Sequence, residues 1–238
     1  SGLVGSEMCI RDSEYGGDKI HSRKNYTWKH PVHEVLQCTG IEKQGWVDLE
    51  IHHFPDHTKS RGQYFPLLVL AVEEDPEDDR NSHYLAREYY FHGIYDKAAD
   101  EFKRHLSLPR AVWKPERAQS MRYLAKCPRE DAIYWLGRAI LECPDRREAY
   151  VDLANVYYKR GDWELCYRNA YSALQITEKP LEYLCDADAW GSLPYDLAAI
   201  SAWNLGDKQS AKVYGTKAVE LAPNDERLQK NLVYYTEG

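Results

Sequence analysis

The residue types that can carry chemistry gather in one short stretch near the start of the chain. Residues 19–37 contain the spacing Arg-x-x-x-x-Trp-x-x-x-x-His-Glu, with Arg23, Trp28, His33 and Glu34 at its fixed positions. An arginine fork can pair with phosphate, and a neutral imidazole can complete a metal site. A neighbouring carboxylate can accept a proton from a hydroxyl group or orient a ligating histidine. An indole can stack on a base or on a sugar face, so one loop offers the parts of a binding site.

Each of these residues also has an ordinary structural interpretation. His33 can be a hydrogen-bonded histidine with no ligand, and Glu34 suits the first turn of a helix, where the dipole favours an acid. Trp28 is compatible with a core position, and Arg23 with a solvated surface. The residue types alone leave both interpretations open.

The stretch resembles the end of the catalytic domain of family 2 glycosyltransferases, where an aromatic-rich loop leads into a His-Glu pair. The resemblance continues through a strand expected at 46–54, which alternates imperfectly and is followed by Pro55, and a helix expected at 60–73. It extends over the helical repeats described below, and so covers residues 19–238.

This resemblance implies transfer of a sugar from a nucleotide-sugar donor to a glycan or peptide acceptor. A divalent metal, Mn or Mg, would absorb the charge of the departing diphosphate. The resemblance implies a catalytic role for Glu34, a metal-ligand role for His33, and substrate binding by Arg23 and Trp28.

The donor-binding half of such enzymes, an α/β domain with an Asp-x-Asp metal motif, would precede residue 14. Asp186-Ala187-Asp188 has this spacing but lies among the repeats, away from any expected strand. We therefore expect this chain to be a C-terminal piece that is inactive by itself. The first 13 residues have no helix or strand period and resemble translated adaptor sequence, so we exclude them from the fold.

Three further histidines, His52, His53 and His57, suggest a second metal site. A spacing of four residues suits two ligands on one helix, but Pro55 lies between His53 and His57 and breaks a helix there. We expect no separate zinc site.

Composition excludes several classes of protein. The formal charge is −7, whereas general nucleic-acid binding needs clustered Lys and Arg. No run of 18 apolar residues would span a membrane. The six cysteines include no Cys-x-x-Cys pair, which favours reduced thiols and a cytoplasmic location.

The rest of the chain repeats with a period of 34 residues. The segment 85–98 matches the segment 153–166, two periods later, and Tyr123 follows Tyr89 by one period. This is the tetratricopeptide (TPR) period. The fold class expected is mainly α, a TPR-like superhelix of helical hairpins preceded by a small α+β remnant of a catalytic domain.

The apolar spacing predicts about four hairpins and a capping helix. Their ranges are 81–92 with 95–107, 115–126 with 129–142, 146–159 with 162–176, 193–204 with 207–221, and 226–235. The domains expected are 1–13 as a non-native tail, 14–73 as the catalytic piece and 74–238 as the repeats.

Small residues mark the hairpins. Gly93, Gly161 and Gly206 stand where the chain leaves one helix with positive φ, and Pro128 takes this place in the second repeat. Ala98, Ala132, Cys166 and Ala211 occupy equivalent positions of the second helices, where close crossing leaves little room. Ala211 comes 11 residues late, which predicts an insertion at 177–192.

The first helices of such repeats line a groove that binds peptides. In the first two repeats the residues expected to line it are basic and aromatic: Arg80, His83, Arg87, Tyr90, Lys114 and Arg117. In the third repeat they are Val151, Asn155 and Tyr158. An acidic peptide or protein partner would fit this lining, although a solvated helix face would show the same residues. Two functions therefore stand side by side: the glycosyltransferase piece with a repeat module for its acceptor or partner, and a non-enzymatic TPR adaptor.

Overall fold

The computed structural model describes residues 24–29, 35–42, 45 and 64–237. The chain forms two compact units that divide between Ala111 and Val112, and each is described here by itself. The strand expected at 46–54, the tail expected at 1–13 and the histidines at 52, 53 and 57 lie outside the described residues.

The first unit contains a short antiparallel pair that the sequence did not predict. Strands β1 (Tyr26–Lys29) and β2 (Val35–Cys38) pair in a register that places Trp28 opposite Leu36. Aromatic and β-branched residues favour this pairing. Asn25 precedes β1 with a φ of 67°, a left-handed conformation that asparagine tolerates.

Three helices complete the first unit: α1 (Tyr64–Glu74), α2 (Asp79–Phe91) and α3 (Tyr95–Ser107). Leu68 of α1 is fully buried against Tyr84 and Leu85 of α2. Phe65 stacks on His92 with ring centroids 4.9 Å apart. The helix expected at 60–73 thus packs on the first hairpin, α2–α3.

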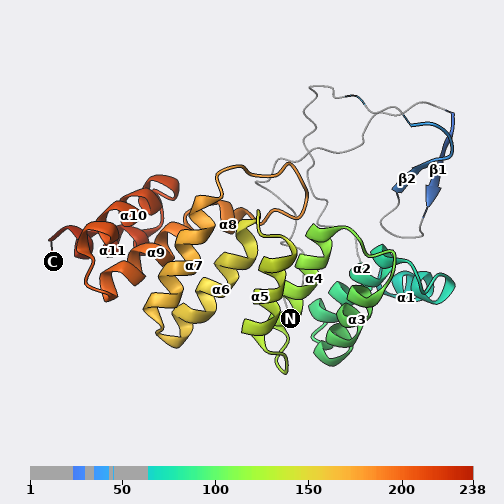
Figure 1. Cartoon of the computed structure of the whole chain (residues 1–238), viewed down its shortest axis with the longest axis horizontal. Helices are drawn as coiled ribbons and strands as arrows, with labels where there is room; N and C mark the ends of the chain where they lie inside the picture. The colour runs from blue at the N-terminus through green and yellow to red at the C-terminus, as the bar shows by residue number, and fades with distance from the viewer. Residues whose placement is uncertain (1–23, 30–34, 43–44, 46–63, 238) are drawn as a thin grey trace. The chain divides into compact units, whose positions relative to one another are not determined.

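The second unit is a row of hairpins (Figure 1). Its helices are α4 (Lys114–Lys126), α5 (Ala132–Glu142), α6 (Arg147–Arg160), α7 (Trp163–Gln175), α8 (Ala187–Trp190), α9 (Leu193–Asn204), α10 (Lys208–Leu221) and α11 (Glu226–Glu237). The four predicted helix pairs and the capping helix are confirmed, with ends that agree within three residues.

The glycines between helices and most of the small residues of the second helices have the conformations and burial that the sequence predicts. Gly93, Gly161 and Gly206 have φ values of 72°, 72° and 84°. Ala98, Cys166 and Ala211 are fully buried, as close helix crossing requires. The mainly helical class is thereby confirmed.

The start of α5 differs from the prediction. The helix begins at Ala132, not 129, because the Asp131 carboxylate accepts a hydrogen bond from the Tyr134 amide at 3.1 Å and caps the helix. Pro128 lies in the preceding turn, and Ala132 is only half-buried.

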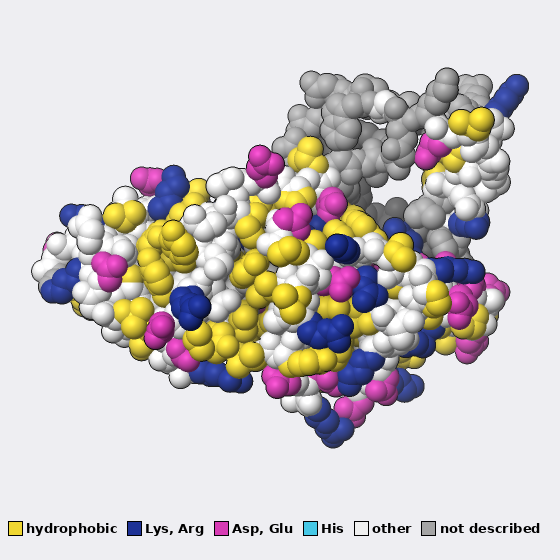
Figure 2. All heavy atoms as spheres, in the orientation of Figure 1, with side chains coloured by type: hydrophobic (Ala, Val, Ile, Leu, Met, Phe, Trp, Pro, Cys, Tyr) yellow, Lys and Arg dark blue, Asp and Glu magenta, His cyan; other side chains and the backbone are white. Residues whose placement is uncertain are grey.

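Among the described residues, no helix is both long and apolar enough to cross a membrane. Figure 2 shows one face of the molecule, on which hydrophobic side chains are interspersed with charged ones. Apolar side chains commonly contribute much of a protein surface.

Candidate functional site

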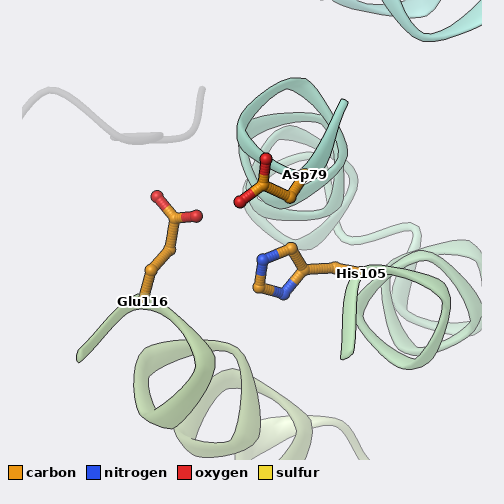
Figure 3. A group of neighbouring side chains, drawn as sticks. All are labelled: Asp79, His105 and Glu116. Carbon is orange, nitrogen blue, oxygen red and sulfur yellow. The ribbon is translucent and has the colours of Figure 1, made fainter. Parts of the chain in front are cut away.

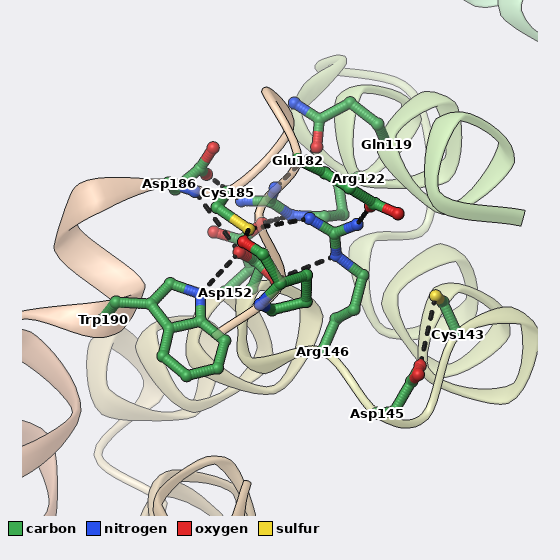
Figure 4. A network of polar contacts seen from close by, with 12 residues as sticks. Gln119, Arg122, Cys143, Asp145, Arg146, Asp152, Glu182, Cys185, Asp186 and Trp190 are labelled. Carbon is green, nitrogen blue, oxygen red and sulfur yellow. Dashed lines mark hydrogen bonds and ion pairs between the residues drawn. The ribbon is translucent and has the colours of Figure 1, made fainter. Parts of the chain in front are cut away.

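The insertion after α7 folds back against α4 and α6, the first helices of the second and third repeats. It begins at Ile176, whose carbonyl accepts a hydrogen bond from Arg147 Nε at 2.7 Å. It continues without regular structure to Cys185 and ends in α8. The polar side chains that hold it are shown in Figure 4.

Arg122 of α4 joins the two helices to the insertion. Only 4% of its side chain is exposed. Its Nε donates to Asp152 of α6 at 2.6 Å, one terminal nitrogen donates to Gln119 at 2.6 Å, and the other donates to Asp186 of the insertion. One guanidinium thus uses both edges of its planar fork.

The charges of this group fix its protonation states. Burial by itself would lower the pKa of Arg122, but Asp152 and Asp186 raise it above the usual arginine value. Burial by itself would raise the pKa of Asp186, but the charge and the hydrogen bond of Arg122 lower it. Both groups remain ionised at neutral pH.

A second arginine repeats the arrangement. Arg146, the N-cap residue of α6, bonds to Glu182 of the insertion and lies 3.6 Å from the Glu148 carboxylate of α6. Glu148 in turn accepts a hydrogen bond from the Trp190 indole at 2.9 Å and one from the Asp186 amide at 3.3 Å. Burial by itself would lower the pKa of Arg146, but Glu148, Cys185 and Glu182 raise it.

An apolar contact lies between the two charge clusters. Leu184 of the insertion is buried. It helps to line a small pocket together with residues of α4, α5 and α6 and of their connections: Pro115, Ala118, Gln119, Arg122, Ala139, Cys143, Arg146, Glu148 and Ala149. Leu184 therefore anchors the insertion between Glu182 and Asp186.

Aromatic side chains add contacts in the middle of the insertion and at its end. The Tyr183 hydroxyl lies 3.4 Å from a Glu116 carboxylate oxygen, and its ring lies 5.7 Å from that of Trp113. Arg147 lies over the Trp190 ring at 4.4 Å, where a cation is attracted to the ring face. The α4–α6 face, defined here by Gln119, Arg122, Arg146, Glu148 and Asp152, is thus built to hold a protein segment.

The structure places the predicted catalytic stretch only in part. Arg23, His33 and Glu34 lie outside the described residues. Trp28 lies on β1 with 64% of its surface exposed, so it is not a core residue. The roles implied by the glycosyltransferase resemblance stay predictions.

In the first repeat, Arg80 and Arg87 are half-buried, and each guanidinium lies 5.2 Å from the centre of the Tyr84 ring. Tyr90, also half-buried, packs edge-on against Tyr95 of α3. The prediction for His83 is wrong. Its side chain is fully buried, with its ring 5.4 Å from that of His105 in α3, so it belongs to the helix–helix interface and reaches no groove.

In the later repeats the predicted lining is also divided. Lys114 is exposed at the start of α4. Arg117 points toward the second helix of its own repeat, because its Nε donates a hydrogen bond to Glu142 of α5 at 2.8 Å. Val151 is buried in the core, which removes it from the predicted lining.

Two predicted groove residues lie on the last turns of α6. Asn155 is half-buried, and Tyr158 is exposed and packs edge-on against Trp163. Their role in a groove stays a prediction.

The residues that hold the insertion were missed by the sequence interpretation. Arg122 and Asp152 are 30 residues apart, and Arg122 and Asp186 are 64 apart. The available signal was the inserted segment itself, which carries the acids Glu182 and Asp186 around Leu184. In the sequence, Asp186 stands out only through its Asp-x-Asp spacing with Asp188.

Two polar side chains of the first unit also come together, where α2 begins and α3 ends (Figure 3). An oxygen of Asp79 and a ring nitrogen of His105 lie within 4.8 Å of each other. An acid in the first turn and a histidine in the last turn both suit helix dipoles, so this pair is explained by the fold. Glu116, drawn in the same figure, belongs to the second unit with Tyr183.

No protein-family model and no curated protein matches the sequence. Among solved structures, the chain is similar to PilF of Pseudomonas aeruginosa, with a TM-score of 0.54 and 15% identity, covering 73% of this chain and 72% of that one. It is similar to MamA, with a TM-score of 0.53 and 18% identity, covering 68% and 89%. It is similar to yeast Tom70, with a TM-score of 0.52 and 16% identity, covering 75% and 36%.

Likeness at such low identity shows the fold alone. The helical hairpins of this chain are TPR-like, as the period of 34 residues predicted. These likenesses concern the helical repeats and lend no support to the glycosyltransferase resemblance.

Proposed function

We propose that the repeats form a protein-interaction module, which binds a segment of a partner protein across the first helices of its hairpins. This is the adaptor alternative, and the TPR-like fold favours it over the glycosyltransferase interpretation. The observation that carries it is the α4–α6 face. That face already holds an irregular protein segment through Arg122, Arg146 and the contact around Leu184.

The physical properties of this face suit peptide recognition. Guanidinium forks bind carboxylates with directional, charge-assisted hydrogen bonds. The buried side chain of Leu184 adds apolar area to the contact, which favours association. Because repeats present equivalent first helices, α2 and α9 offer further positions along the same kind of surface. In α2, Arg80 and Arg87 flank Tyr84 and make that helix basic and aromatic.

The test is a display library of short peptides that is panned against the intact chain. The sites of the retained peptides are then mapped by hydrogen–deuterium exchange. We expect protection in the first helices (α2, α4, α6 or α9), and selected peptides rich in acidic residues. Retention of no peptide, or protection confined to second helices such as α5 and α10, would refute the proposal.

A matched pair of charge reversals sharpens this test. Lys114 is exposed on the first helix α4, and Lys212 is exposed on the second helix α10. Lys114→Glu should weaken binding of acidic peptides that map to α4, whereas Lys212→Glu should leave it unchanged. Equal effects of both variants would indicate a non-specific charge effect.

The glycosyltransferase interpretation remains a separate hypothesis, supported only by the pattern from Arg23 to Glu34 and its context. Its test is recovery of the longer open reading frame and assay of nucleotide-sugar turnover with Mn²⁺, comparing the parent with His33→Ala. Metal-dependent turnover that His33→Ala abolishes would support it. A reading frame that begins near Glu14, or turnover indifferent to His33, would remove it.

A further inference from the structure

The arginines of the α4–α6 face have contacts within their own helices as well as with the insertion. Arg122 is held by Gln119 of its own helix and by Asp152 of α6, at 2.6 Å each. Arg146 lies beside Glu148 of α6. Each arginine therefore has partners on the helices and keeps one edge of its fork for a carboxylate supplied from outside them. A binding face with pre-set side chains loses less conformational entropy when it is occupied.

The insertion supplies what this face needs at three alternate positions. Glu182 reaches Arg146, Leu184 lines the pocket, and Asp186 reaches Arg122. Its own backbone adds little structure: the Cys185 amide bonds to the Glu182 carbonyl at 3.4 Å, and residues 176–186 include neither helix nor strand. Side chains, more than backbone pairing, hold the segment in place.

These contacts define a recognition pattern that a partner can share. We propose that the α4–α6 face recognises a protein segment with an acid, an apolar residue and a second acid at alternate positions, and that the chain's own Glu182–Asp186 occupies this face in cis and competes with the partner. The inference rests on the proposed function and names the chemistry of the partner and the control of its access.

Competition in cis has a defined consequence for affinity. A tethered segment acts as a ligand at an effective concentration in the millimolar range, about the value for short flexible linkers. A free partner must displace it, so its apparent affinity is reduced by the fraction of time that the face is open. The face would be fully available only where the partner is abundant, or where it contacts additional first helices.

The experiment uses the intact chain and a synthetic peptide of residues 178–190, labelled with fluorescein and kept in reducing buffer. The opened variant carries Glu182→Gln, Leu184→Ala and Asp186→Asn in the chain, which keeps the length of the insertion. By fluorescence anisotropy, we expect the opened variant to bind the peptide at least about tenfold more tightly than the unmodified chain does.

Matched peptides test the pattern without altering the protein. Asp186→Asn in the peptide removes the carboxylate that meets Arg122 and should weaken binding about tenfold. Asp188→Asn removes a carboxylate that is exposed in the chain, and should change binding less than about twofold. Equal effects of the two substitutions would overturn the recognition pattern.

The remaining outcomes are also decisive. If the opened variant folds but binds no peptide, the contacts of the insertion only stabilise the fold, and the proposed recognition pattern is wrong. Equal binding by both chains would show that the face is not occupied in cis. A dimer of the unmodified chain that the peptide dissociates would assign the segment to exchange between two copies instead of a partner.

If the opened variant does not fold, competition is measured in the unmodified chain. Excess peptide should speed hydrogen exchange at the amides of Cys185 and Asp186, which bond to Glu182 and Glu148 in the cis arrangement. Unchanged exchange at saturating peptide would refute displacement. Library peptides that map only to α2 or α9 would leave the interaction module standing while this inference failed.

Discussion

Replacing Arg122 by methionine removes the charge that joins α4, α6 and the insertion while keeping most of the apolar stem. Arg122→Met leaves the carboxylates of Asp152 and Asp186 facing a neutral side chain. Breaking a buried ion pair by removing one partner costs about 3–5 kcal/mol. Here Asp152 and Asp186 are 23% and 37% exposed, so water can solvate them in part. We therefore expect a loss of about 2–3 kcal/mol in the free energy of unfolding of the second unit.

The loss should depend on pH in a defined direction. In the unmodified chain the folded-state pKa of Asp186 is depressed, so its ionised form contributes stability above the unfolded-state pKa. This stability is lost as pH falls through the still lower folded-state pKa. In the variant, Arg122 no longer offsets the burial of Asp186, so we expect the folded-state pKa of Asp186 to be higher than in the unmodified chain. The difference between the two proteins should therefore be largest near pH 7 and smaller near about pH 4.

The assay is urea denaturation followed by tryptophan fluorescence and circular dichroism near these two pH values. Lys217→Met is the control, because Lys217 lies 2.9 Å from Glu220 in an exposed pair on α10. Such pairs contribute little, and the denaturation midpoint should not move. A loss below about 1 kcal/mol for Arg122→Met, or an equal loss at both pH values, would refute the reasoning about the buried network.

Two local predictions accompany this one. A Cβ at Gly215 of α10 would lie 2.6 Å from Cδ2 of Tyr235, whereas a Cβ at Gly137 of α5 would meet no atom within 4 Å. Gly215→Ala should lower the free energy of unfolding by about 1–2 kcal/mol through overpacking, and Gly137→Ala should raise it by about 0.5–1 kcal/mol. Thermal and urea unfolding measure both changes. Stabilisation by both substitutions would show that Tyr235 moves aside freely. The Asp162 carboxylate caps α7 by accepting a hydrogen bond from the Leu165 amide at 3.2 Å. In the same assay, Asp162→Ala should lower the free energy of unfolding by about 1 kcal/mol, and Asp162→Asn should lower it much less. An equal loss for both substitutions would argue against the cap.

The first unit shows where sequence patterns fail. Strands β1 and β2 have four residues each, too few for alternation to be recognised. His83 has the correct helical spacing for a groove residue, yet it is buried beside His105. Helical period places a residue on a side of its helix, but it does not decide whether a neighbouring helix or solvent meets that side.

The sequence alone determined the repeat architecture of this protein. The period of 34 residues, the glycines at positions 93, 161 and 206 and the small residues of the second helices predicted the hairpins. The glycines and the small residues succeed as signals because each acts within one hairpin. The period succeeds because each repeat is one hairpin that packs on the next.

Only the tertiary structure decided what the first helices of the second and third repeats bind. The insertion was predicted from an excess of 11 residues, but its course was not. Arg122 meets Asp186 across 64 residues, and Arg146 meets Glu182 across 36. Ion pairs at such separations have no local period, because their geometry exists only after the helices have packed and buried the two arginines.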